Sequence, residues 1–158
     1  MSLEEILKML KPYATEKHLE QFNLTNDCDF SFEHENRARF RVNLLKQNRG
    51  IGAVLRLIPS KVLSMEELKL GEIFRTICGI PRGLVLVTGP TGSGKSTTLA
   101  TMIDFINETR KEHILTIEDP IEFVHKSKKS LITQREINRD TASFKSALKA
   151  ALREDPDI

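Results

Sequence analysis

The sequence predicts an α/β protein in which part of a small α+β domain precedes a parallel sheet. Three features predict this fold class. Residues 29–44 alternate between apolar and polar side chains, as antiparallel strands with one covered face do. Two mostly apolar runs, 84–87 and 113–117, are typical of parallel strands covered on both faces. A helical apolar pattern between these runs indicates a crossover unit.

The chain begins with two expected helices. Apolar side chains recur at helical spacing over residues 3–10, and Pro12 ends the run because proline lacks the backbone donor that a helix interior needs. A second short helix is expected at 16–22. These helices would cover one end of the sheet that follows.

A hairpin and a third strand follow these helices. Strands are expected at 29–33 and 39–44, with a third strand at 53–58 that Pro59 closes. Antiparallel strands with helices at one end favour a small α+β domain. We therefore expect two parts, residues 1–59 and residues 60–158, the second beginning with a linker.

The second part carries the parallel sheet. A strand at 84–87 leads into a glycine-rich loop, and a helix at 99–110 precedes the next strand at 113–117. Ser64 and Glu67 form a predicted capping box in the linker. The other expected elements are a helix at 71–78, a short strand at 131–136 and a helix capped by Asp140 or Thr141.

Composition and charge are those of a soluble globular protein, with 39% hydrophobic and 29% charged residues. No apolar run approaches the roughly 20 residues of a membrane-spanning helix, so membrane insertion and secretion are not expected. The net charge of +2 gives no long-range field for nucleic acid. Cys28 and Cys78 are interpreted as buried apolar residues, and Lys126, Lys128 and Lys129 as a solvated loop.

The glycine-rich loop matches the pattern G-x-x-x-x-G-K-[ST] between a predicted strand and a predicted helix. Its glycines let successive backbone N–H groups point at phosphate oxygens, and the positive end of the following helix adds to the attraction. Lys95 is expected to reach the β and γ phosphates, and Ser96 to bind magnesium. The predicted nucleotide-binding residues are Gly89, Pro90, Thr91, Gly92, Ser93, Gly94, Lys95, Ser96 and Thr97.

Three carboxylates, Glu118, Asp119 and Glu122, follow the strand at 113–117. They would lie at the carboxyl edge of the sheet, where open α/β folds bind ligands. One interpretation is that they face the γ phosphate, where a carboxylate can orient or deprotonate the attacking water. The other is a simple turn in which Asp119 caps a helix that begins at Pro120. The spacing favours neither.

Four segments carry a resemblance to a known family: 82–88 before the glycine-rich loop, 116–125, 134–136 and 151–157. They are similar to the secretion ATPases, and within them to the pilus-retraction ATPases of twitching motility. The resemblance implies a RecA-like ATPase domain preceded by a PAS-like domain, with ATP and Mg²⁺ as cofactors. It also implies a homo-hexamer on the cytoplasmic side of the inner membrane, peripheral at the base of the pilus, with a platform protein as partner.

The resemblance also assigns roles to individual residues. Glu122 would activate water, and Lys95 would act on the transferred phosphate. Glu118 and Asp119 would join Ser96 at the metal. Arginines of the early hairpin would reach the nucleotide of a neighbouring subunit, and the candidates are Arg39, Arg41 and Arg56. A solvated strand face is the alternative for these arginines.

The chain departs from the family at both ends. Members carry further elements before the matched segment, and the Walker B strand is expected only beyond Ile158. We therefore expect a partial ATPase core. The alternatives are a pilus-assembly or type II secretion ATPase of the same family, and a non-catalytic nucleotide-binding fragment. A metabolic P-loop kinase is a weaker alternative, because no acceptor-binding motif is recognisable.

Overall fold

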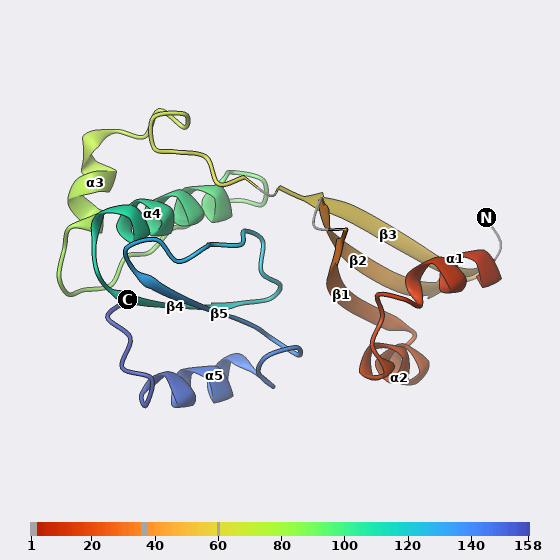
Figure 1. The fold of residues 1–158 in the computed structure, drawn as a ribbon. Coiled ribbons are helices and arrows are strands. Elements are labelled where there is room, and N and C mark those ends of the chain that lie inside the picture. Colours follow the sequence, from red (N-terminus) through yellow and green to blue (C-terminus); the bar gives the residue numbers. More distant parts are fainter. Residues whose placement is uncertain (1–2, 36–37, 60) are drawn as a thin grey trace. The chain divides into compact units, whose positions relative to one another are not determined.

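The structure is a computed structural model that describes residues 3–35, 38–59 and 61–158. The chain divides into two compact units, Met1–Ser60 and Lys61–Ile158 (Figure 1). The predicted boundary residue, Ser60, lies outside the described residues. Both units mix helices and strands, and the α/β fold class is confirmed.

The first unit is a three-stranded antiparallel sheet with two helices. The strands lie in the order β1-β2-β3. Every predicted element is present, and most are longer than predicted. The bounds are α1 Leu3–Leu10, α2 Glu16–Thr25, β1 Asp27–His34, β2 Ala38–Gln47 and β3 Gly50–Ile58. The predicted hairpin turn at 34–36 includes Asn36, which lies outside the described residues.

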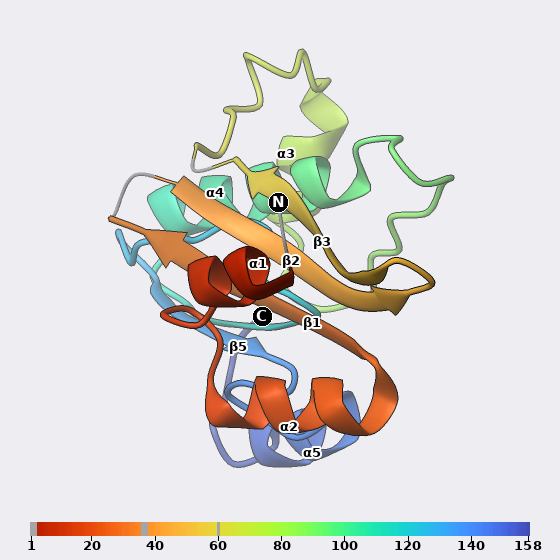
Figure 2. The same ribbon diagram turned by 90° about the vertical axis from the view of Figure 1, so that its right-hand side faces the viewer.

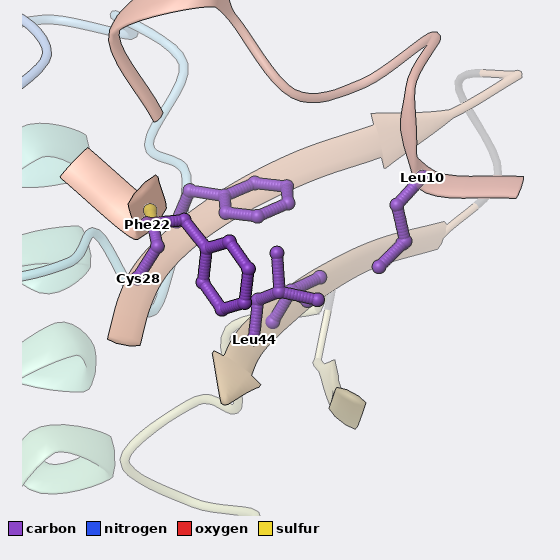
Figure 3. Packing of buried hydrophobic residues seen from close by; sticks show 6 residues of the cluster. Leu10, Phe22, Cys28 and Leu44 are labelled. Carbon is purple, nitrogen blue, oxygen red and sulfur yellow. The ribbon is translucent and has the colours of Figure 1, made fainter. Parts of the chain in front are cut away.

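One face of this sheet forms a core under the two helices. Because side chains alternate along a strand, β1 and β2 present their apolar residues to the same side. Phe22 of α2 and Leu10 of α1 pack on this face, and Figure 3 shows them turned toward the strand side chains. The buried members are Leu10, Phe22, Cys28, Phe30, Val42 and Leu44. Polar and charged residues are left for the opposite face.

The second unit contains a parallel strand pair between two helices. β4 (His113–Glu118) pairs with β5 (Leu131–Glu136) in a register that places Glu118 opposite Glu136. α4 (Lys95–Thr109) and α5 (Phe144–Ala151) lie on opposite sides of this pair, and α3 (Glu72–Cys78) packs beside α4 (Figures 1 and 2). The carboxyl ends of both strands therefore lie at the same edge of the sheet, as predicted.

The expected strand at 84–87 is the main difference from the sequence prediction. Leu84 and Leu86 are 83% and 74% exposed, and the segment forms no strand. A strand needs backbone partners. β4 has β5 on one edge, and the backbone of Ile158 bonds to His113 and Leu115 on the other. Residues 84–87 consequently find no ladder partner among the described residues, and the predicted crossover is reduced to α4 and β4.

Two predicted capping interactions have different outcomes, and the first precedes a turn at 65–69 rather than a helix. Ser64 and Glu67 form the capping box, since the Glu67 carboxylate accepts from Ser64 N–H (2.7 Å) and Ser64 Oγ accepts from Glu67 N–H (3.1 Å). The prediction of Asp140 or Thr141 as the cap of α5 was wrong. Ser143 caps this helix, and its Oγ accepts from Ser146 N–H at 3.1 Å. Asp140 instead accepts from Glu136 N–H at 2.9 Å.

Candidate functional site

The glycine-rich loop has backbone angles that only glycine adopts readily. Gly89, Gly92 and Gly94 have φ values of 153°, 79° and 86°. A Cβ on Gly89 would lie 2.8 Å from Ser93 Oγ, which is closer than real Cβ contacts allow. Gly94 is the N-cap of α4, so the loop runs directly into the positive end of a helix of 15 residues. This backbone suits the binding of an anion.

Lys95 and Ser96 begin helix α4. The ammonium group of Lys95 donates to the carbonyl oxygens of Gly89 (2.9 Å) and Pro90 (2.8 Å), so this side chain folds over the loop. Ser96 is exposed, whereas Thr97 is partly buried and its carbonyl accepts from Thr101 Oγ1 at 2.9 Å. A cation and a hydroxyl therefore lie at the mouth of the loop.

A cavity of about 580 Å³ joins the start of α4 to the end of β4. The predicted carboxylates line it, and apolar side chains of α4 and one of α5 form part of its wall. Its lining includes Ser96, Leu99, Glu118, Asp119, Glu122, His125 and Phe144. The structure thus brings the loop serine and the three carboxylates to one cavity. Their catalytic and metal-binding roles remain predictions.

The segment that carries Glu122 is an irregular loop. Residues 119–125, all of them described, form no helix, so the interpretation of Asp119 as a helix cap was wrong. Ile121 and Phe123 are only 3% and 8% exposed, whereas Glu122 between them is exposed. With both neighbouring side chains buried, Glu122 is the residue of the three that faces solvent, at the wall of the cavity.

Glu118 is held by hydrogen bonds within the protein. Its Oε1 accepts from Thr116 Oγ1 (2.6 Å) and Gln134 Nε2 (3.0 Å), and its Oε2 accepts from Glu122 N–H (3.3 Å). Asp119, in contrast, is exposed. Sequence reasoning did not identify Gln134 as a partner here. The feature that could have pointed to Gln134 is its position in the segment 134–136, on the strand that pairs with β4.

The loop after Glu122 is tied to helix α4 by a buried amide that the sequence did not reveal. Asn107 is fully buried; its Nδ2 donates to Lys126 O (2.8 Å), and its Oδ1 accepts from Lys128 N–H (2.9 Å). The ammonium group of Lys128 also pairs with Asp104 (2.8 Å) and Glu108 (2.7 Å) of α4. Lys128 is therefore an ion-pair partner of α4 rather than part of a freely solvated cluster.

His125 is a buried titratable group in the cavity wall. Its side chain is 4% exposed, and its Nδ1 lies 3.8 Å from Asp104 Oδ1, which is too long for a hydrogen bond. This nitrogen has no hydrogen-bond partner within the described part of the chain. Burial lowers the pKa of His125 below its ordinary value, and the opposing effect of Asp104 and Glu118 is smaller.

We expect the protein to lose stability in mild acid through His125. With a depressed folded pKa, the unfolded chain takes up the proton first, so stability decreases as pH falls below about 6.5. The loss is at most about 1.4 kcal/mol per pH unit for one proton. Urea unfolding of the full-length protein at pH 7.5 and 5.5 measures it. His125→Gln should reduce the difference between the two pH values; an unchanged difference would exclude His125 as its source.

The three candidate arginines share the polar face of the first unit's sheet. Arg41 and Arg56 are directly opposite each other on β2 and β3, and Arg39 lies two residues along β2 from Arg41. Arg39 donates to Ser31 Oγ (3.1 Å), and Arg41 to Asp29 Oδ2 (3.3 Å). Arg41, Arg56 and Asp29 line a hollow of about 280 Å³. Their predicted role toward a neighbouring nucleotide remains a prediction.

The described residues lack two other kinds of site. They contain no helix that is both long enough and apolar enough to span a membrane. They also contain no cluster of three or more His, Cys, Asp or Glu side chains suited to holding a metal ion.

Comparisons with known proteins agree on one family. The family model "Type II/IV secretion system protein" matches residues 9–158. The type IV pilus retraction ATPase PilT of Pseudomonas aeruginosa is 59% identical over 155 residues, which cover 98% of this chain and 45% of that protein. A twitching motility protein of Neisseria gonorrhoeae is 60% identical over 158 residues, covering 100% of this chain and 42% of that protein.

A solved structure gives the same result. The crystal structure of the pilus retraction motor PilT with bound ADP superposes with a TM-score of 0.91 at 48% identity, covering 97% of this chain and 45% of that one. The chain thus spans less than half the length of the relatives it matches. The matched family model extends over both units, including the glycine-rich loop and the carboxylate loop, and the chain belongs to the type II/IV secretion system protein family.

Proposed function

We propose that this chain binds ATP through residues 89–97 and forms part of a motor subunit that powers retraction of type IV pili. One observation carries the proposal. Ser96, which ends the glycine-rich loop at the start of α4, and the exposed Glu122 line the same cavity of about 580 Å³. That arrangement suits phosphoryl transfer to water, which needs a phosphate cradle and a group that orients the attacking water.

Binding of the nucleotide would use the backbone and Lys95. N–H groups of the loop and the N-terminus of α4 attract the phosphates, and the Lys95 ammonium would exchange its contacts with Gly89 and Pro90 for β- and γ-phosphate oxygens. Mg²⁺ suits the hydroxyl and carboxylate oxygens of Ser96 and Asp119, with Glu118 as a further candidate, and would neutralise phosphate charge there.

Hydrolysis would use Glu122 as the base or orienting group for water. The burial of Ile121 and Phe123 restricts where Glu122 can point, and a carboxylate that is fixed in this way loses less freedom when it engages water. General-base catalysis by a positioned side chain contributes typically about 10²- to 10⁴-fold to the rate. The residue is exposed, which leaves room for water beside it.

The arginines of the first unit would act between subunits of a homo-hexamer. Like charges directly opposite on neighbouring strands destabilise a sheet, and Arg41 and Arg56 form such a pair. Asp29 offsets Arg41 at 3.3 Å. A phosphate group from a neighbouring subunit's nucleotide would offset the remaining positive charge, since guanidinium groups bind phosphate in a fixed fork geometry. Arg39 would extend this surface.

The choice of pilus retraction rests on similarity to retraction and twitching-motility proteins at 59–60% identity. A motor of this kind would work on the cytoplasmic side of the inner membrane, against a platform protein at the base of the pilus.

Titration of the full-length protein with ATP and Mg²⁺ tests the nucleotide step, and saturable binding is expected. Restoration of twitching in a strain without its retraction ATPase tests the motor step. Absence of saturable binding would overturn the whole proposal, whereas binding without restored twitching would overturn only the retraction role.

A further inference from the structure

The loop that carries Glu122 is held by side chains rather than by its own backbone. Within the described residues, positions 119–125 take part in no backbone-to-backbone hydrogen bond. Their backbone groups bond instead to three side chains at the ends of β4 and β5. These side chains are Glu118, Gln134 and Glu136. The path of this loop therefore depends on a few strand residues.

Gln134 makes more of these contacts than either carboxylate. Its Oε1 accepts from His125 N–H at 2.7 Å, and its Nε2 donates to Phe123 O at 2.8 Å. The same Nε2 donates to Glu118 Oε1 at 3.0 Å. Because a backbone N–H only donates and a carboxylate only accepts, these partners fix which end of the amide is which. One side chain thus joins both strands to the loop.

The two carboxylates complete the support on the other side of Glu122. Glu136 Oε2 accepts from Ile121 N–H at 3.1 Å, and Glu118 Oε2 accepts from Glu122 N–H at 3.3 Å. Gln134 holds the loop just after Glu122, and Glu136 holds it just before. The direction in which Glu122 meets the cavity is consequently set from both sides.

We propose that Gln134 is a positioning residue that orients Glu122 toward the attacking water, acting through the loop and without touching the nucleotide. This inference rests on the proposed ATPase function. The positioning role needs an amide at position 134, because the side chain must both accept and donate a hydrogen bond. A glutamate of the same shape could accept from His125, but it could not donate to Phe123 O and would face the Glu118 carboxylate across 3.0 Å.

The test compares Gln134→Met and Gln134→Glu with the unchanged full-length protein. Misplacement of a catalytic group by about 1 Å costs up to about 10²-fold in rate, so kcat should fall about 10- to 100-fold. The dissociation constant of Mg-ATP should stay within about threefold, because the phosphate cradle lies on another element. Gln21→Met, at an exposed position of α2, is the matched control and should leave kcat unchanged.

A second measurement reads the loop directly. Hydrogen exchange of residues 119–125 should be faster in both Gln134 variants, while exchange of the β4 amides should be unchanged. If the Gln134→Met protein does not fold, kcat and loop exchange of the Gln134→Glu protein serve as the test. Unchanged loop exchange together with unchanged kcat would overturn the proposal.

A double-mutant cycle separates positioning from general damage. If Gln134 acts through Glu122, then Gln134→Met should lower kcat much less in a Glu122→Gln background than in the unchanged protein. An equal fold-loss in both backgrounds would overturn the proposed role of Gln134. Failure of the ATPase function would look different, since the unchanged protein would then bind or hydrolyse no ATP.

Discussion

Lys95→Ala is expected to lower the affinity of the full-length protein for Mg-ATP by at least about 10²-fold. The Lys95 ammonium already bonds to two carbonyl oxygens at the edge of the loop, so it is within reach of a polyphosphate held there. Hydrogen bonds that involve a charged group contribute about 1.5–3 kcal/mol each, and two such bonds correspond to a loss of this size. Isothermal titration calorimetry measures the affinity directly.

Lys111→Ala is the matched control for this change. It removes the same charge from an exposed position of the same unit, beyond the end of α4. Its affinity for Mg-ATP should equal that of the unchanged protein. Equal affinity of the Lys95→Ala protein would contradict the assignment of residues 89–97 as the phosphate site.

Glu122→Gln should leave nucleotide binding intact and lower turnover by roughly 10² to 10⁴, the usual contribution of a positioned base. The amide keeps the size and exposure of the glutamate, and the buried Ile121 and Phe123 still fix the loop, but the amide cannot take a proton. Steady-state phosphate release, with binding measured in parallel, checks both halves of the expectation.

The appropriate comparison is Glu20→Gln, which makes the same chemical change at an exposed position of α2. Its turnover should match that of the unchanged protein. Should Glu122→Gln also retain full turnover, Glu122 would have no part in activating water, although ATP binding by the loop could still hold.

Local patterns predicted most of the fold because each is governed by neighbours in the sequence. Alternation along 29–44 marked the core face of the hairpin, and the Ser64–Glu67 capping box follows from a three-residue spacing. The strand at 84–87 was predicted wrongly for the converse reason. A strand forms only with a partner, and whether a partner is available cannot be read from the strand's own residues.

The glycine-rich loop was recognised from the sequence because its pattern is contained in eight consecutive positions, and the binding roles of its residues remain predictions. The residues that hold the Glu122 loop in place were not predicted from the sequence. Gln134 lies 12 positions beyond Glu122, and the parallel register of β4 and β5 places it opposite Thr116, from where its side chain reaches Glu118. Asn107 was missed likewise, since a lone asparagine in a helix gives no sign that a distant loop will bond to it.

The uncovered segment 84–87 has a consequence for handling the protein. Leu84, Val85 and Leu86 expose large apolar side chains to solvent, and within the described part of the chain their backbone groups form no strand hydrogen bonds. Such a segment is a template for adding a strand from another molecule, and it contains no charge or proline that would discourage this. Concentrated preparations of the isolated 158-residue chain should therefore aggregate. Leu84→Lys or Leu86→Lys should reduce this aggregation, because a charge in the segment disfavours the addition of a strand.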